Sequence, residues 1–205
     1  MNKYEDQYYI VFKKYDEHTL YLASLQKTAD RDYEYEKLDL GDEPLYFENA
    51  YKEQDKTNPS PKKIGQFHMN MDLLIVHNEI REKLKDFKID NFQLYPSVII
   101  DDEGQLHDNY WYFSIYKEFD CVDYENSEIR NYEENVDDHK IRKYIFSEEA
   151  MDNIPEERRL IFRPMNMNIG HTIIHKKIVN IFKQFDTSAL NLVKVSEWHA
   201  GTQFR

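Results

Sequence analysis

The stretch Leu73-Leu74-Ile75-Val76-His77 is an apolar run that ends in a polar residue. Apolar residues then recur at helical spacing, at Ile80, Leu84 and Phe87. The run predicts a buried strand, and the spacing predicts an amphipathic helix that begins directly after it. A turn and a second predicted strand follow the helix. Residues 73–95 are therefore predicted to form one strand–helix–strand unit around which the chain is organised.

A similar unit is predicted 98 residues later, over residues 171–195. There Thr172-Ile173-Ile174-His175 replaces the first strand, and Ile178, Phe182 and Phe185 take the apolar helical positions. Six residues are identical at this offset: Ile75 and Ile173, His77 and His175, Ile80 and Ile178, Lys85 and Lys183, Phe87 and Phe185, Leu94 and Leu192. Internal duplication and the shared demands of a strand that feeds an amphipathic helix both explain this similarity.

Other β-branched and aromatic runs predict further strands. Tyr8–Phe12 and Thr19–Ala23 flank a polar turn and predict an N-terminal hairpin. Leu94–Ile100 and Tyr110–Tyr116 flank an acidic turn that contains Gly104, which predicts a second hairpin. So few helices among so many strands favour an α+β fold, with mixed or antiparallel sheets and two similar strand–helix–strand units.

A polar, proline-containing stretch divides the chain. Asn58-Pro59-Ser60-Pro61 predicts a turn or linker, because each proline lacks a backbone donor and restricts the residue before it. We therefore expect an N-terminal β-rich lobe with its linker at residues 1–63. The remaining residues, 64–205, are expected to form an α+β domain that contains both units.

Composition indicates a folded protein of the cytoplasm. The 205 residues are 40% hydrophobic and 15% aromatic, which argues against disorder throughout. A single cysteine, Cys121, excludes an internal disulfide, and the polar, acidic residues 1–9 do not resemble a secretion signal. No run approaches the roughly 18 apolar residues of a membrane span.

The net charge of −12 is concentrated in one stretch. Residues 101–138 hold thirteen acidic residues against Lys117 and Arg130, a net charge of −11. Such a surface repels nucleic acid and anionic lipid, and it favours a basic protein partner. The alternative is a solvated surface that keeps the domain soluble. As a binding face, the stretch offers these candidate partner-binding residues: Asp120, Asp123, Tyr124, Glu125, Glu128, Tyr132, Glu133, Glu134, Asp137 and Asp138.

The histidines do not have the pattern of a metal site. His171 and His175 are four residues apart, but Thr172 stands where a zinc-protease helix needs Glu, and a third ligand is missing. On a strand the two side chains would lie about 13 Å apart, too far to share a metal. We interpret His175, like His77, as a residue that ends a strand and helps to start a helix.

Other catalytic patterns are absent as well. Cys121 has acidic neighbours that suppress its thiolate, so burial explains it better than nucleophilic catalysis with His107 or His139. Acidic pairs such as Asp101-Asp102 fall in predicted loops without a supporting pattern. The five glycines form no phosphate-binding loop. We therefore predict no enzyme, no catalytic residue, no metal and no cofactor.

Three short elements accompany the two units: Asp120–Ser127, Leu160–Arg163 and Gly201–Phe204. Together with the units they resemble a bacterial immunity-protein family, the polymorphic-toxin immunity class numbered eleven, formerly a domain of unknown function. That family's pattern has a D-x-x-D-x-x-x-S element, an lFR strand and a terminal Gly-x-x-Phe. His77 and His175 stand where the pattern has Ser. The resemblance covers about residues 73–204.

The resemblance implies a non-enzymatic protein that binds a cognate toxin and protects the producing bacterium. We hypothesise that it neutralises the toxin by occlusion through its acidic surface, and that a nuclease or other basic effector is the target. The alternative is a non-catalytic scaffold or adaptor, with a homo-oligomer as one form of it, and a small hydrolase is a weaker alternative. The sequence leaves the toxin and the oligomeric state open.

Overall fold

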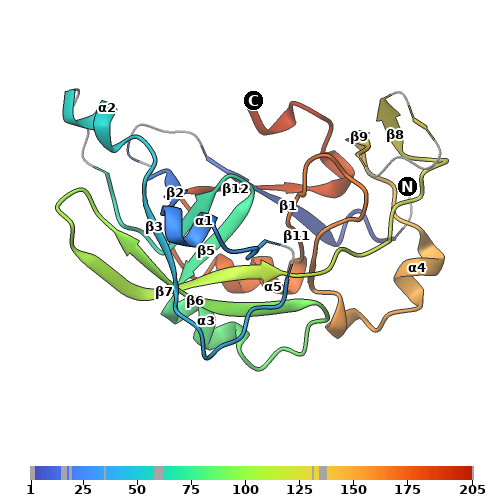
Figure 1. Ribbon diagram of the computed structural model, residues 1–205. Coiled ribbons are helices and arrows are strands. Elements are labelled where there is room, and N and C mark those ends of the chain that lie inside the picture. The colour runs from blue at the N-terminus through green and yellow to red at the C-terminus, as the bar shows by residue number, and fades with distance from the viewer. Residues whose placement is uncertain are drawn as a thin grey trace.

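The computed structural model describes residues 3–14, 18, 20–34, 36–57, 62–130, 132–133 and 138–204. Their strands form a six-stranded sheet, a four-stranded sheet and a two-stranded ribbon (Figure 1). Short helices connect and cover these sheets, in which antiparallel pairing predominates. The predicted α+β class is therefore confirmed.

The larger sheet has the strand order β2 (Leu22–Ser24), β3 (Leu45–Asn49), β6 (Phe92–Ile100), β7 (Leu106–Ile115), β5 (Leu73–His77), β4 (Phe67–Asn70). The hairpin predicted from the two runs around Gly104 is confirmed as β6 and β7. The two edges of the sheet also meet, because Tyr21 forms a β-bridge with Met69 and the side-chain amide of Asn70 donates to Ser24 Oγ at 2.9 Å. One face of this curled sheet buries an aromatic-rich cluster that includes Leu45, Phe47, Ile75, Tyr95 and Tyr112.

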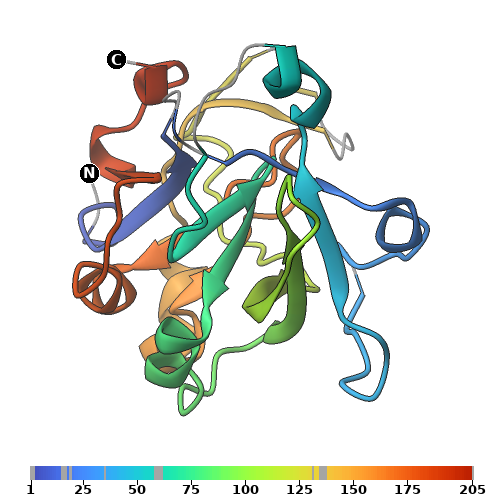
Figure 2. The same ribbon diagram turned by 90° about the vertical axis from the view of Figure 1, so that its left-hand side faces the viewer.

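The smaller sheet has the order β10 (Ile161–Phe162), β11 (Ile173–His175), β1 (Tyr8–Lys13), β12 (Leu190–Lys194). The predicted N-terminal hairpin is wrong, because β1 pairs with β11 and β12, whereas β2 pairs with β3. In Figure 2 the dark-blue β1 and the light-blue β3 lie on opposite sides of the molecule. The physical reason is that both faces of β1 are apolar, which requires a central position.

The two predicted strand–helix–strand units have the same architecture. In the first, β5 leads through α3 (Asn78–Leu84) to β6, and β7 lies between these two strands. In the second, β11 leads through α5 (Lys176–Phe182) to β12, and β1 lies between them. The inserted strand is antiparallel to both of its neighbours in each unit.

Equivalent histidines begin the two helices, as predicted. His77 Nδ1 accepts the Glu79 amide at 3.4 Å, and His175 Nδ1 accepts the Lys177 amide at 3.3 Å. Each interaction satisfies one of the amides that a helix start leaves without an intrahelical partner. Each histidine also faces a tyrosine of the inserted strand in the sheet register, with ring centroids 5.4 Å apart for His77 and 5.0 Å apart for His175.

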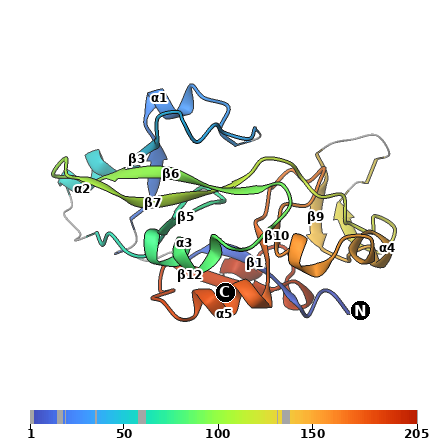
Figure 3. The ribbon, with the colours of Figure 1, turned by 90° about the horizontal axis from the view of Figure 1, so that it is seen from below.

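Helices α3 and α5 lie side by side (Figure 3). They bury Ile80, Leu84, Ile178 and Phe182 in a cluster that also takes side chains from both sheets. A second cluster packs against the other face of the smaller sheet and holds Tyr144, Phe146 and Trp198. The two sheets are thus joined through one shared apolar layer.

The remaining elements are α1 (Gln26–Ala29), α2 (Lys52–Thr57), the ribbon strands β8 (Glu128–Arg130) and β9 (Lys140–Lys143), α4 (Glu148–Asp152), and 3-10 helices at Glu156–Arg158, Val195–Glu197 and Thr202–Phe204. Residues 58–61 lie outside the described part of the chain, so the predicted boundary at residue 63 stays a prediction. No helix among the described residues has the length and apolar character needed to cross a membrane.

Three buried histidines make the fold sensitive to acid. Burial lowers the pKa of His68, His171 and His175 to about 4, from an unfolded value of 6.5. Between these values the unfolded chain binds more protons than the folded chain. The free energy of unfolding should therefore fall as the pH drops from 6.5 to 4, by on the order of 1 kcal/mol per pH unit for each histidine. Urea unfolding at a series of pH values measures this slope.

Single substitutions separate the contributions to this slope. His171→Asn keeps an acceptor near the Tyr144 hydroxyl, which lies 2.8 Å from His171 Nδ1, and should flatten the dependence. The same substitution at the exposed His199 is the matched control and should leave the dependence intact. An equal slope in all three proteins would contradict the assignment.

Candidate partner-binding site

The structure divides the acidic stretch between two ends of the molecule. The turn between β6 and β7, which carries Asp101, Asp102 and Glu103, projects on the left of Figure 1, whereas β8 and β9 lie on the right. The described acidic residues between positions 101 and 138 therefore lie on two surfaces and not one. The separation follows from β7, because an extended strand of ten residues spans about 33 Å.

At the β6–β7 turn, the carboxylates organise the local backbone. Asp101 Oδ1 accepts the amides of Glu103 at 3.1 Å and Gln105 at 2.8 Å, and its Oδ2 lies 2.9 Å from His107 Nε2. The hydrogen bond from His107 lowers the pKa of Asp101. Asp102 accepts from the Asn49 side chain. The polar groups of this surface are thus largely used within the fold.

At the opposite end, the Asp120–Ser127 segment is hydrogen-bonded to residues 145–147. The Asp123 amide donates to the Ile145 carbonyl at 2.9 Å. Ser127 Oγ donates to that same carbonyl at 3.1 Å and accepts the Ile145 amide at 2.9 Å. The Asp123 carboxylate accepts both the backbone and the side-chain amide of Asn126. Asp123 and Ser127 therefore have structural roles that hold the neighbouring side chains in place.

An aromatic groove lies beside the ribbon and is formed in part by the Asp120–Ser127 segment. Tyr132 stacks on His139 with ring centroids 5.1 Å apart, and Tyr124 contacts both rings at 6.0 and 5.3 Å. Burial is the main cause that raises the pKa of Tyr124, and the charge of Asp120 adds to it. The groove has a volume of about 480 Å³ and is lined by Tyr124, Glu125, Ser127, Ile129 and Tyr132.

Of the ten predicted partner-binding residues, three line this groove: Tyr124, Glu125 and Tyr132. The exposed ones are Asp120, Glu125, Glu128, Tyr132, Glu133 and Asp138, while Asp123 and Tyr124 are half-buried. Glu134 and Asp137 lie outside the described residues. The structure thus brings part of the predicted set together at one surface. The contacts of these residues with a partner stay a prediction.

Sequence reasoning missed several residues of this surface. Ile129 and the buried His139 form walls of the aromatic cluster, and the only signal for them was their position beside the acidic run. Pairing of β8 with β9 also places Lys140 opposite Arg130 and Lys143 opposite Glu128. The ribbon therefore carries cations next to the acids. The net charge calculated for residues 101–138 leaves out Lys140 and Lys143.

No group of three or more His, Cys, Asp or Glu side chains among the described residues is arranged to hold a metal ion. His171 and His175 have separate partners, since His171 contacts the Tyr144 hydroxyl and His175 caps α5. Cys121 is buried, and burial raises the pKa of its thiol well above the usual value, with Asp120 adding to the effect. The packing interpretation of Cys121 is therefore confirmed.

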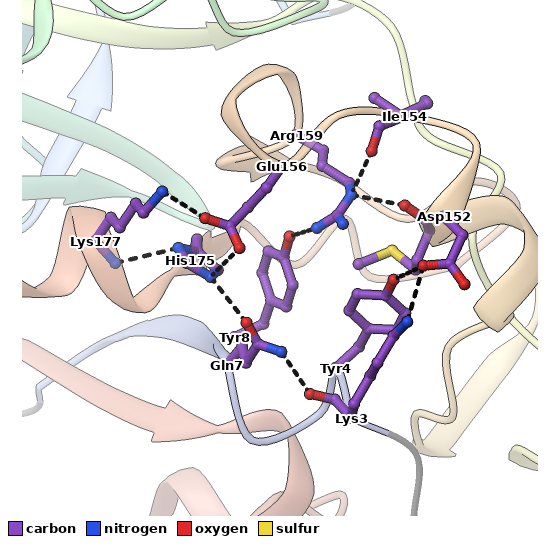
Figure 4. A network of polar contacts seen from close by, with 11 residues as sticks. Lys3, Tyr4, Gln7, Tyr8, Asp152, Ile154, Glu156, Arg159, His175 and Lys177 are labelled. Carbon is purple, nitrogen blue, oxygen red and sulfur yellow. Dashed lines mark hydrogen bonds and ion pairs between the residues drawn. The ribbon is translucent and has the colours of Figure 1, made fainter.

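A second polar cluster surrounds the buried Arg159 (Figure 4). Its Nε donates to the carbonyls of Met151 and Ile154, both at 2.9 Å, and its Nη1 donates to the Tyr8 hydroxyl. Burial raises the pKa of Tyr8 to about 12, against the opposing effect of the arginine charge. The guanidinium thereby links β1 to the end of α4.

Ion pairs extend this cluster to the second unit. Glu156 pairs with Lys177 at 2.5 Å and lies 3.7 Å from His175 Nε2. The Lys177 ion pair is the main cause that lowers the pKa of Glu156. Figure 4 shows the labelled side chains directed at one another. The cluster is a structural connection between segments, and the candidate partner-binding site is the aromatic groove.

Residues 43–153, 111 of the 205, match the Immunity protein family (Imm11). This chain belongs to that family. The matched region contains the first strand–helix–strand unit, the Asp120–Ser127 element and the whole aromatic groove. None of the curated proteins compared with the chain matches it.

Membership of Imm11 confirms the family indicated by the sequence and assigns the chain a role in toxin immunity. It also indicates a binding protein rather than a catalyst. The match begins at residue 43, whereas the resemblance seen in the sequence began at about residue 73. Residues 43–72 are thus a part of the family region that the sequence motifs did not indicate. Leu160–Arg163 and Gly201–Phe204, which were part of the resemblance, lie beyond the matched residues.

Ser127→Ala should destabilise this Imm11 protein by about 1–3 kcal/mol, because the Ile145 amide and carbonyl both lose a half-buried partner. Urea unfolding measures the change. The matched control is the exposed Ser188→Ala, which should shift the free energy of unfolding by about 0.5 kcal/mol or less. Equal effects of the two substitutions would show that Ser127 does not hold the segment.

Proposed function

We propose that this Imm11 protein binds a cognate bacterial toxin in the cytoplasm of the producing cell and neutralises it by occlusion, without catalysis. Family membership supports toxin immunity. We further propose that the toxin contacts the ribbon end of the molecule. The proposed contacts are Asp120, Asp123, Tyr124, Glu125, Glu128, Tyr132, Glu133, Glu134, Asp137 and Asp138.

The observation that carries this proposal is the aromatic groove among exposed carboxylates. Tyr132 is 50% exposed although its ring stacks on the buried His139. An exposed aromatic side chain that is already held in place loses little conformational freedom on binding, and such residues often dominate binding energy. The acids around it are Asp120, Glu125, Glu128, Glu133 and Asp138.

The acids of this surface suit a toxin with a basic cleft, such as a nuclease, and Arg130, Lys140 and Lys143 of the ribbon offset only part of their charge. Opposite charges on two partners accelerate their encounter, and salt screens this effect. The aromatic groove would then supply the short-range contacts that slow dissociation. Occlusion requires only that the bound immunity protein keep substrate from the toxin, so no reactive group is needed.

Co-expression with the toxic C-terminal domain encoded beside this gene tests the proposed function. Bacteria that produce both proteins should survive, and the two should co-purify as a stable complex. Bacteria that produce the toxin domain alone should die. Death of the co-producing cells, or survival without a complex, would refute neutralisation by direct binding.

A charge reversal tests the location of the interface. Glu128→Lys with Glu133→Lys should weaken toxin binding about 10- to 100-fold at low salt, because both acids are exposed at the ribbon end. Glu103→Lys with Asp108→Lys changes the net charge equally at the β6–β7 end and should have a much smaller effect. Calorimetric titration measures both. Equal losses would indicate a global charge effect and exclude the ribbon surface as the specific contact.

A further inference from the structure

The aromatic groove has the chemistry of a site for a positively charged side chain. Of the described residues that line it, only Glu125 is charged, and the others contribute two tyrosine rings, a hydroxyl and an aliphatic side chain. Tyrosine faces attract cations, and a carboxylate beside them adds a charge-assisted hydrogen bond. The lining thus favours a cation over an anion or a purely apolar group.

Elsewhere the chain covers its own aromatic faces with cations. Lys27 Nζ lies 3.4 Å from the centroid of the Tyr46 ring, Lys13 Nζ lies 4.1 Å from that of Tyr21, and Arg81 lies 4.1 Å from the Trp111 ring. No lysine or arginine of the described residues is placed in this way over Tyr124 or Tyr132. The tyrosine rings of the groove can therefore form with a partner the cation–π contact that other aromatic side chains of this protein form with its own lysines and arginines.

The walls of the groove are held in place before any partner arrives. One face of Tyr132 lies against His139, with an angle of 25° between the rings. The His139 amide donates to Asn166 at 2.9 Å, and its carbonyl accepts from Asn168 at 3.1 Å. The Tyr124 hydroxyl donates to the Met165 carbonyl at 3.4 Å. A guest side chain would consequently bind without reordering these rings.

We infer that the groove receives an arginine side chain of the protein partner, with the guanidinium stacked on Tyr132 and hydrogen-bonded to the Glu125 carboxylate. A planar guanidinium can stack on a ring and donate to a carboxylate at the same time, whereas an ammonium group is a strongly hydrated point charge. The inference rests on the proposed function, in which the arginine belongs to the toxin. It adds the chemical identity of the anchoring residue.

Two small probes test the groove without the toxin. N-acetyl-arginine amide carries the guanidinium, and N-acetyl-citrulline amide replaces it by a neutral urea of the same shape. Nuclear magnetic resonance titration should show saturable shifts of the Tyr132 ring and of the Ser127 and Ile129 amides with the arginine probe. Binding of the citrulline probe should be about tenfold weaker.

Matched variants assign the response to the groove. Tyr132→Ala and Glu125→Gln should each abolish saturation by the arginine probe. Tyr51→Ala removes a tyrosine of similar exposure, 49%, and Glu103→Gln removes an exposed acid of the β6–β7 turn, so both controls should bind as the parent does. Equal binding of the two probes, or saturation that persists in Tyr132→Ala, would overturn the inference.

Failure of this inference and failure of the proposed function give different results. Rescue of co-expressing bacteria without a response to the arginine probe would overturn the groove as an arginine site and leave toxin neutralisation standing. A response to the arginine probe without rescue would overturn the toxin as the source of the side chain. Rescue together with a selective arginine response supports both.

Discussion

The apolar layer around α3 and α5 is the constraint on which the rest of the structure depends. It takes Leu74 and Val76 from the larger sheet, Val11 and Ile174 from the smaller one, and the inward faces of both helices. Because each sheet buries its other face in a different cluster, neither can leave this layer without exposing apolar surface to water. The shared layer consequently fixes the two sheets relative to each other, and the ribbon with its groove packs on the outermost cluster.

The two units that build this layer are alike beyond their apolar spacing. A strand that feeds an amphipathic helix needs apolar residues at fixed positions, but it does not need a histidine cap or a tyrosine opposite that histidine. Both features occur in both units, together with an inserted antiparallel strand. Internal duplication and the shared demands of a strand that feeds a helix therefore both stay interpretations of this similarity. The inserted strand is β7 in one unit and β1, from the far end of the chain, in the other.

A protein that neutralises another by occlusion needs a rigid surface more than a reactive one. The polar clusters of this Imm11 protein fit that requirement, since Arg159 and its neighbours connect segments while the Asp120–Ser127 element holds the groove. Asp123 and Ser127 in that element hydrogen-bond to the backbone, so they hold the groove in place.

The sequence by itself determined the local features: both strand–helix–strand units, the histidine caps, the β6–β7 hairpin, the burial of Cys121 and the family. The structural features among these follow from hydrophobic periodicity and from the chemistry of neighbouring residues, whereas the family was indicated by the resemblance of short motifs. Only the tertiary structure decided that β1 joins β11 and β12, that β7 separates the acids into two surfaces, and that Ile129 and His139 complete the groove. Such pairings depend on which apolar faces remain to be buried after the whole chain has folded, and no local pattern encodes that choice.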